Sequence, residues 1–204
     1  MRFLHLGDLH LGKTLGDFDL IEDQKYILDQ ILHITEEKSI DGVLIAGDVY
    51  DKSIPSEAAT KLLDYFLIAL AAKGIKVFMV SGNHDSDERL NFGSTLFASS
   101  QIFISAVFDG TLHRQSFADG DTEIAVYMLP FVKASQVRHY FPDEDINSYD
   151  DAVRTIIRNT LIDKRNKNIL VAHQFVAGKG EDPALAGSES VGTQRVGLVE
   201  KMGY

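Results

Sequence analysis

The sequence contains no cysteine among its 204 residues, which excludes two kinds of structure. Without thiols the chain can form no disulfide bond, and no cysteine thiolate can compete for a metal ion. Proteins of a reducing compartment do not depend on disulfide bonds, so the composition suits the cytoplasm. We therefore expect a cytoplasmic protein whose metal ligands include no thiolate.

Long hydrophobic runs are missing as well. The longest uncharged apolar run covers residues 66–72, far below the ~20 residues that a membrane-spanning helix needs. The apolar stretch at the amino terminus is interrupted by Asp8 within a few residues, so it resembles neither a signal peptide nor a membrane span. We expect no membrane association.

Positive charge is scarce, because 20 Lys and Arg residues stand against 30 Asp and Glu residues and the formal net charge is −10. Contacts to DNA phosphates need Lys and Arg, so this balance argues against a free-standing nucleic-acid-binding surface. Metal ions would neutralise some of the carboxylates, and DNA is therefore not excluded as a substrate. With 45% hydrophobic residues and no internal repeat, the sequence is typical of one domain, and only residues 177–197, rich in Gly and Ser, resemble a linker.

One pattern occurs four times in the chain: a short apolar run ends in a small residue, and a polar residue able to bind metal follows. The runs cover residues 4–6, 43–46, 77–80 and 169–172, and each is expected to be a buried strand. Because ligands collect at the carboxyl ends of strands joined by helical crossovers, we expect the four segments to converge on one site. The polar residues after the runs are Asp8 and His10; Asp48 and Asp51; Asn83, His84 and Asp85; and His173.

The types of these residues indicate the chemistry. Carboxylate and amide oxygens suit Mn²⁺ or Mg²⁺, and imidazole brings in Mn²⁺, Fe²⁺ or Zn²⁺, so the mixed set favours a borderline divalent ion. Asp48 lies in chain order between the Asp8/His10 pair and the Asn83/His173 pair, and two metals sharing Asp48 is the economical interpretation. Two ions ~3.5–4 Å apart can hold the attacking and departing oxygens of a displacement at phosphorus. The pattern therefore predicts phosphoester hydrolysis.

Two further roles follow from the third and second motifs. His84 directly follows the ligand Asn83, and Asp85 beside it can fix its ring, a pair suited to protonating or stabilising a leaving alkoxide. Asp51, at the fourth position of its motif, is expected to orient a ligand without touching the metal.

Between the motifs the chain alternates between strand and helix patterns, which predicts an α/β fold. One helix is expected before each of the second, third and fourth runs; the second is entered through residues 53–55 and closed by Gly74, and the third begins at a capping box of Ser148 and Asp151. From residue 102 to 129 the pattern changes to strands without helices, with Asp119-Gly120 as a hairpin turn. The apolar positions of the three helices are, in order, Ile27, Ile31 and Ile34; Leu62, Leu63, Phe66 and Leu70; and Val153, Ile156, Ile157 and Leu161.

Together and in this order, the motifs resemble those of the calcineurin-like metallophosphoesterases, and the resemblance extends over nearly the whole chain. The residues around them are most similar to the SbcD branch of that family, the nuclease subunits that act with an SbcC-type ATPase. The segments that match this branch are Met1 to Lys13, Gly47-Asp48-Val49-Tyr50-Asp51 and His173-Gln174-Phe175-Val176-Ala177-Gly178, while Gly82-Asn83-His84-Asp85 matches the wider family.

This resemblance implies a sandwich of two mixed β-sheets flanked by helices. It implies one Mn²⁺ held by Asp8, His10 and Asp48, and a second held by Asp48, Asn83 and His173, with Mg, Fe or Zn as alternatives. The implied activity is that of a Mn-dependent DNA nuclease, a double-strand 3′–5′ exonuclease and single-strand endonuclease in DNA repair and recombination. The implied partners are DNA as substrate, the ATPase subunit, and a second copy in a homodimer that uses the apolar residues of segments 62–70 and 90–97.

The family pattern continues after the fourth motif with a strand ending in Gly-His-x-His, and then with DNA-capping and ATPase-binding segments. None of these occurs in this sequence, so we expect residues 1–204 to form a nuclease domain that lacks its carboxyl-terminal strands and one imidazole per ion. Such a site would bind metal more weakly than that of a longer relative. Two alternatives stay open: a dinuclear-metal phosphoesterase acting on small phosphodiesters or phosphoproteins, and an inactive truncated fragment.

Overall fold

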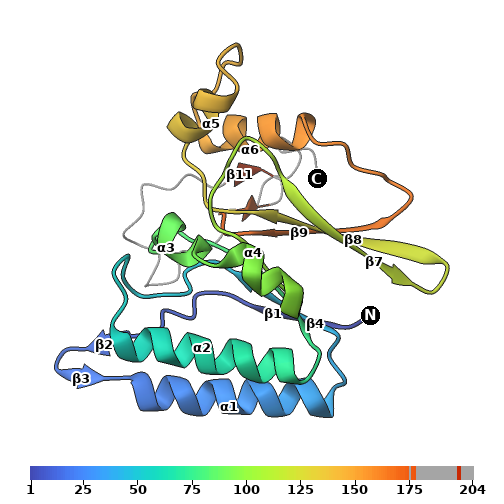
Figure 1. Ribbon diagram of the computed structural model, residues 1–204. Helices are drawn as coiled ribbons and strands as arrows, with labels where there is room; N and C mark the ends of the chain where they lie inside the picture. Colours follow the sequence, from blue (N-terminus) through green and yellow to red (C-terminus); the bar gives the residue numbers. More distant parts are fainter. Residues whose placement is uncertain (175, 178–196, 199–204) are drawn as a thin grey trace. The chain divides into compact units, whose positions relative to one another are not determined.

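The computed structural model describes residues 1–174, 176–177 and 197–198 (Figure 1). The chain divides into two compact units. The first consists of Met1–Val107, His113–Phe131 and Lys164–His173, and the second of Phe108–Leu112, Val132–Asp163 and Gln174–Tyr204. Apart from its two ends, the linker-like stretch expected at residues 177–197 lies outside the described residues, as do residues 199–204.

A four-stranded sheet in the order β1-β4-β5-β6 forms the centre of the first unit. All three strand pairs are parallel, as crossover connections through helices require. The strands are β1 Phe3–Leu6, β4 Gly42–Ala46, β5 Lys76–Val80 and β6 Ile102–Ser105, and the helices between them are α1 Ile21–Glu37, α2 Glu57–Ala72, α3 Asp87–Asn91 and α4 Ser94–Phe97, followed by a 3₁₀ turn at Ala98–Ser100. A small hairpin of β2 Thr14–Leu15 and β3 Phe18–Asp19 follows β1.

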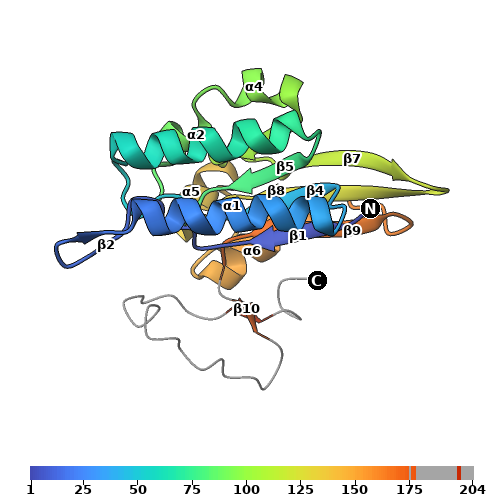
Figure 2. The ribbon, with the colours of Figure 1, turned by 90° about the horizontal axis from the view of Figure 1, so that it is seen from below.

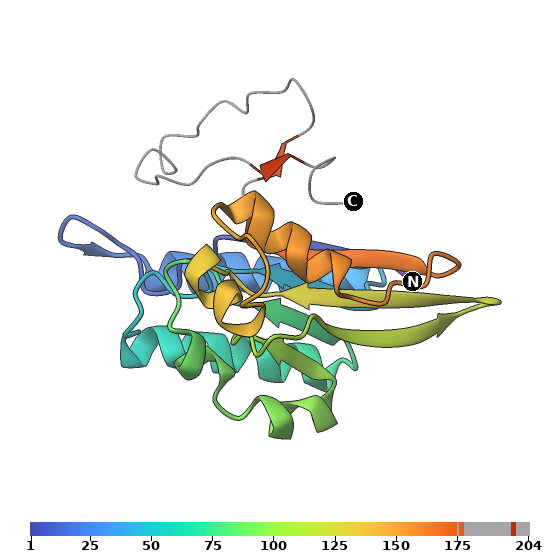
Figure 3. The same ribbon diagram turned by 90° about the horizontal axis from the view of Figure 1, so that it is seen from above.

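A second sheet of three strands, in the order β7-β8-β9, completes the first unit. Its strands are β7 His113–Asp119, β8 Thr122–Leu129 and β9 Lys167–Ala172. The antiparallel β7–β8 hairpin, drawn in yellow-green in Figure 3, turns at Gly120 with a φ of +66°, which confirms the hairpin turn expected from the sequence. Strand β9 then pairs in parallel with β8, so this sheet is mixed while the first is wholly parallel.

The two sheets pack face to face, and helices cover the other face of the first sheet. The first sheet has one hydrophobic core on each face, and alternate residues of β4 belong to different cores. Val43 and Ile45 pack with residues of α1 and α2, whereas Leu44 and Ala46 pack with residues of β8 and β9. Helices α1 and α2 lie side by side along the first sheet (Figures 1 and 2). Because both faces are covered, every side chain of β4 is buried. The predicted α/β fold with two sheets and flanking helices is confirmed.

Helix α2 forms as the sequence predicts. Its N-cap Ser56 accepts a hydrogen bond from the Ala59 amide, and Gly74, with a φ of +70°, follows its end. All four of the apolar positions expected to face the core are buried. In the described part of the chain no helix combines the length and apolar character that a membrane crossing requires.

Helix α1 also forms, but it turns a different face to the core. The buried residues are Leu28, Leu32 and Thr35, whereas Ile27 and Ile34 are 54% and 38% exposed and Ile31 is partly buried against the core, so the buried face is offset by one residue from the predicted apolar positions. Both triplets have the same helical spacing and lie about 100° apart around the axis, so periodicity could not choose between them. Packing against the sheet makes the choice.

The second unit contains α5 Ala134–Tyr140, α6 Tyr149–Arg158 and a parallel pair of short strands, β10 Val176–Ala177 and β11 Gly197–Leu198. The predicted capping box is present, because Ser148 Oγ accepts from the Asp151 amide and Asp151 Oδ2 accepts from the Ser148 amide. Leu161 is 94% exposed beyond the helix, so its assignment to the apolar face was wrong. The helix ends early because the side chains of Asn159 and Thr160 bond back to carbonyls of the last turn.

Phe78 joins the two sheets of the first unit and provides a test of this packing. Its ring is fully buried, with ring centroids of Phe103 and Phe117 at 5.5 and 5.6 Å. We expect Phe78→Ala to lower the free energy of unfolding by ~3–5 kcal/mol, because it leaves a cavity between the sheets. Urea denaturation measures this loss. The control Phe18→Ala removes a ring that is 76% exposed, and an equal loss in both variants would contradict the assigned core.

Candidate metal centre

Three of the expected ligands have an unusual backbone conformation. Asp8, His10 and Asp48 have φ angles of 53°, 43° and 47°, and only two other non-glycine residues in the described segments have a positive φ. For an ordinary residue this left-handed conformation costs ~1–2 kcal/mol. Such strain persists only where the surrounding structure enforces it, and it collects at functional sites.

The loops after β1 and β4 enforce these conformations on each other. Beyond the ends of the strands, the amide of Asp8 donates to the Gly47 carbonyl at 3.2 Å and that of His10 donates to the Asp48 carbonyl at 2.9 Å. The Leu11 amide then bonds to the Val49 carbonyl at 2.9 Å. Pairing between β1 and β4 thus continues into the loops and brings the first two motifs together.

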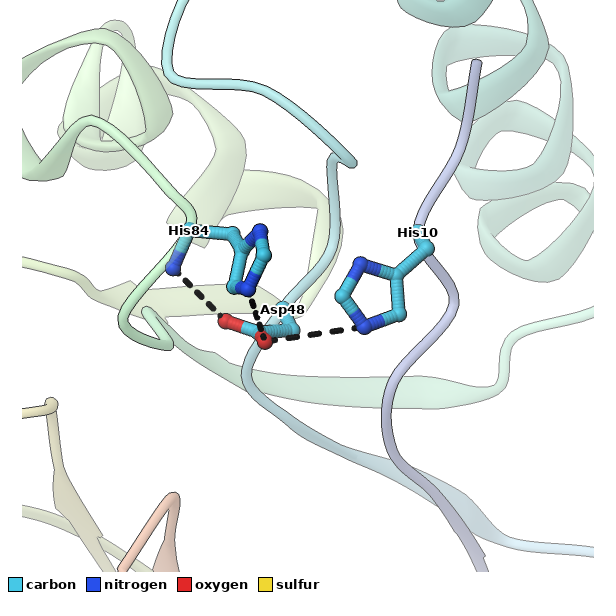
Figure 4. A group of neighbouring side chains, drawn as sticks. All are labelled: His10, Asp48 and His84. Atoms are coloured by element: carbon cyan, nitrogen blue, oxygen red, sulfur yellow. Dashed lines mark hydrogen bonds and ion pairs between the residues drawn. The ribbon is translucent and has the colours of Figure 1, made fainter. Parts of the chain in front are cut away.

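The carboxylate of Asp48 lies at the centre of the site, and its side chain is 5% exposed. Its Oδ2 atom is 3.6 Å from Nε2 of His10, 3.5 Å from Nε2 of His173 and 3.9 Å from Nε2 of His84. Figure 4 shows the rings of His10 and His84 pointing at this carboxylate from two separate segments. Burial opposes ionisation of Asp48, but the His173 side chain and the His84 backbone N–H outweigh it, so the pKa of Asp48 lies below its usual value.

The imidazole nitrogens and the carboxylates at the site form groups that could hold metal ions. The separations of 3.5–3.9 Å are longer than normal hydrogen bonds, and they are also wider than the ~3–3.4 Å between donors that bind one ion at ~2.1 Å. Two groups of three possible ligands occur among the described residues, and both include Asp48. They are His10, Asp48 and His84, and Asp8, Asp48 and His173. The donor set therefore fits two divalent ions that share one carboxylate.

His173 reaches the site from β9, in the other sheet. Its Nδ1 atom donates to the Ala46 carbonyl at 2.7 Å, which leaves Nε2 facing Asn83 Oδ1 at 3.2 Å and Asp48. Burial lowers the pKa of His173, but the adjacent carboxylate of Asp48 raises it by more, and the net pKa lies above the usual value. A proton and a metal ion would therefore compete for Nε2.

His10 is held beside two carboxylates. Its Nε2 atom is 3.8 Å from Asp8 Oδ1, and its Nδ1 atom is 3.5 Å from Asp51 Oδ1. Burial lowers the pKa of His10, which favours the neutral ring that a metal requires. In the described part of the chain, Nδ1 is buried without a hydrogen-bond partner. Asp51 thus lies beside the ring that it could orient, and this role stays a prediction.

Asp85 does not contact the His84 ring, so the predicted pairing of these two side chains was wrong. Its carboxylate accepts from the amides of Val49, Tyr50 and Gly82 at 3.1, 2.9 and 2.8 Å. Burial raises the pKa of Asp85 although the three N–H groups oppose the rise. The His84 Nδ1 atom instead lies 3.2 Å from the Asp51 carbonyl oxygen. Through the hydrogen bonds of its carboxylate, Asp85 therefore links the loop after β4 to its own loop after β5.

Sequence analysis did not identify Gln24, whose side-chain amide bonds to the backbone of the loop that carries Asp8 and His10. Gln24 lies on α1, and no local pattern marks it, because its partners are 12 to 15 residues away.

The absence of a side chain at Gly82 leaves room for the carboxylate of Asp48. A Cβ atom on Gly82 would overlap Oδ1 and the amide nitrogen of Asp48. We expect Gly82→Ala to displace Asp48 and to weaken Mn²⁺ binding at both ions by ~10-fold or more. Calorimetric titration measures the affinities.

The matched control is Gly7→Ala, at the end of the neighbouring strand. Its added Cβ would meet only the Ala46 carbonyl oxygen at 3.8 Å and the Ala46 Cβ at 3.9 Å, which are ordinary contacts. Wild-type affinity in Gly82→Ala would show that Asp48 is not a ligand of either ion.

Two comparisons with known proteins agree with this geometry. A family model described as calcineurin-like phosphoesterase matches residues 1–193. A curated relative, the SbcD subunit of the SbcCD nuclease of Staphylococcus epidermidis, is 37% identical over 187 residues, which cover 87% of this chain and 47% of the relative. The chain thus spans about half the length of that relative.

Proposed function

Because this chain belongs to the calcineurin-like phosphoesterase family, we propose that it is the catalytic core of a metal-dependent nuclease that hydrolyses phosphodiester bonds in DNA. The family supports the phosphoesterase chemistry, and the relative, named as a nuclease subunit, supports the substrate. The observation that carries the proposal is the convergence of the motif residues on the buried carboxylate of Asp48.

We assign one Mn²⁺ ion to Asp8, His10 and Asp48 and a second to Asp48, Asn83 and His173, although the donor atoms that lie closest together around Asp48 group Asp8 with His173 and His10 with His84. The support is a mixture of carboxylate, amide and imidazole donors without sulfur, which Mg, Fe or Zn could also use. Bound ions of this kind stabilise charge on the phosphoryl oxygens and lower the pKa of water.

His84 is assigned to the leaving oxygen of the substrate. Its side chain is 47% exposed, so the ring is accessible to a substrate. Its Nδ1 atom faces the Asp51 carbonyl, which orients the ring and leaves Nε2 to hold a proton or deliver it. The position of His84 beside His10 and Asp48 also suits a metal ligand, and the two roles predict different behaviour on mutation.

Substitution separates these roles. We expect His84→Ala to lower hydrolysis of bis(p-nitrophenyl) phosphate by ~10²–10⁴-fold, the usual contribution of a general acid, with two ions still bound. Asp48→Ala should lose both ions. Metal content by elemental analysis and hydrolysis rates are measured on the same samples. The control His33→Ala, on the exposed face of α1, should retain both ions and the wild-type rate.

If His84→Ala loses metal, His84 is a metal ligand and the proposed role is wrong. If His84→Ala hydrolyses the substrate at the wild-type rate, His84 does not take part in catalysis.

The finer parts of the proposal rest on similarity to the relative. They are 3′–5′ digestion of duplex ends, endonuclease cleavage of single strands, action in the cytoplasm in DNA repair and recombination, and assembly with an SbcC-type ATPase. The net charge of −10 supports the need for a partner, because a strongly acidic chain has little surface with which to hold DNA by itself. End-labelled duplexes with Mn²⁺ test the substrate, and hydrolysis of small phosphodiesters without any cleavage of DNA would contradict a nuclease.

The chain is also expected to form a homodimer. Leu67 and Leu90 are buried in the core, but Ile68, Phe92 and Leu96 are 60%, 83% and 78% exposed. Exposed apolar residues on α2 and around α4 are what a two-fold interface would use. Sedimentation at micromolar concentration should show a dimer, and Leu96→Glu should convert it to a monomer.

The control Leu161→Glu, at a site 94% exposed in the second unit, should leave the dimer intact. A folded wild-type protein that stays monomeric would contradict the dimer.

A further inference from the structure

The loop from Asp8 to Gly12 contains three left-handed residues at alternate positions. Asp8, His10 and Gly12 have φ angles of 53°, 43° and 86°. Such a chain cannot make the hydrogen bonds of a helix or a strand, and its carbonyl and amide groups need other partners. Pairing with the loop after β4 satisfies the amides of Asp8, His10 and Leu11, and the Lys13 amide donates to the His10 carbonyl at 3.1 Å. In the described part of the chain, the Leu9 carbonyl and the Gly12 amide are bound by a side chain instead.

The side chain of Gln24 bonds to these two groups and also to the His10 carbonyl. Its Nε2 atom donates to the carbonyl of His10 at 2.8 Å and to that of Leu9 at 3.2 Å. Its Oε1 atom accepts from the amide of Gly12 at 2.9 Å. One amide side chain thus binds the loop on both sides of His10.

Glutamine has the chemistry for this position. A primary amide carries two N–H donors and one acceptor oxygen, and the loop presents two acceptors and one donor. Glutamate has the same shape but no donor, and it would place a charge against two carbonyl oxygens. Gln24 itself is held in α1, whose buried residues Leu28 and Leu32 anchor the helix to the core.

We propose that Gln24 is a positioning residue for one of the two metal ions. It holds Asp8 and His10 in the backbone conformation in which their side chains face Asp48. Asn83 and His173 come from other elements, and none of the three backbone groups bound by Gln24 belongs to them. With Asp8 and His10 assigned to one ion, Gln24 acts on that ion and not on the second. This inference rests on the proposed dinuclear site.

The test is a two-site Mn²⁺ titration of the wild-type chain and of Gln24→Glu, followed by calorimetry. Loss of a group that orients ligands typically weakens metal binding by ~10–100-fold. We expect a loss of this size at one ion and a change of less than ~3-fold at the other, in a protein that unfolds cooperatively without metal. Gln24→Leu, which removes donors and acceptor together, should give the same selective loss.

The matched control is Gln30→Glu, the same charge change at an exposed position of the same helix. It should leave both affinities unchanged. Wild-type Mn²⁺ affinities in both Gln24 variants would overturn the inference. An equal loss of affinity at both ions would also overturn it, because such a loss indicates general destabilisation. If Gln24→Leu fails to fold, Gln24→Glu decides. A wild-type chain that binds no Mn²⁺, Mg²⁺, Fe²⁺ or Zn²⁺ would overturn the dinuclear site itself, and the role of Gln24 with it.

Discussion

The buried carboxylate of Asp48 is the group on which the arrangement of the site depends. It meets His10 from the loop after β1, the amide of His84 from the loop after β5, and His173 from the other sheet. These contacts exist only when the two sheets pack face to face, so the site and the core between the sheets form together. Burying the charge of a carboxylate costs free energy unless a cation is close to it. A metal ion bound between Asp48 and the three imidazoles would supply that positive charge.

Residues in the loops around Asp48 have strained backbone conformations, and hydrogen bonds with side chains outside the ligand set stabilise these loops. Burying Asp85 raises its pKa, and its three backbone hydrogen bonds offset part of that cost. They hold the loops after β4 and β5 in register with each other. Gln24 does the same for the loop after β1 from the side of the helices. Neither residue carries an expected metal ligand atom, yet both determine where the ligand-bearing backbone runs, in the manner of supporting groups in other metal sites.

Glycines make the close approaches at the site possible. The ring of His173 lies against Gly47, where a Cβ would come within 2.5 Å of the Cβ of His173, and Gly82 leaves room for the carboxylate of Asp48. The motifs therefore combine two requirements, a ligand and the space around it. This explains why each of these glycines stands directly before a ligand, Asp48 or Asn83.

Features that depend on neighbours in the chain could be predicted from the sequence: the strands that end in ligands, the Gly120 turn, the Ser148 capping box and the buried face of α2. Their signals are periodicity and turn chemistry, which act over a few residues. Only the tertiary structure decided that α1 buries Leu28 rather than Ile27, that α6 ends before Leu161, and that His173 comes from a different sheet. It also directed Asp85 to backbone amides and Gln24 to a loop 12 to 15 residues away. These outcomes depend on contacts between distant parts of the chain, and such contacts leave no local pattern from which a single sequence could predict them.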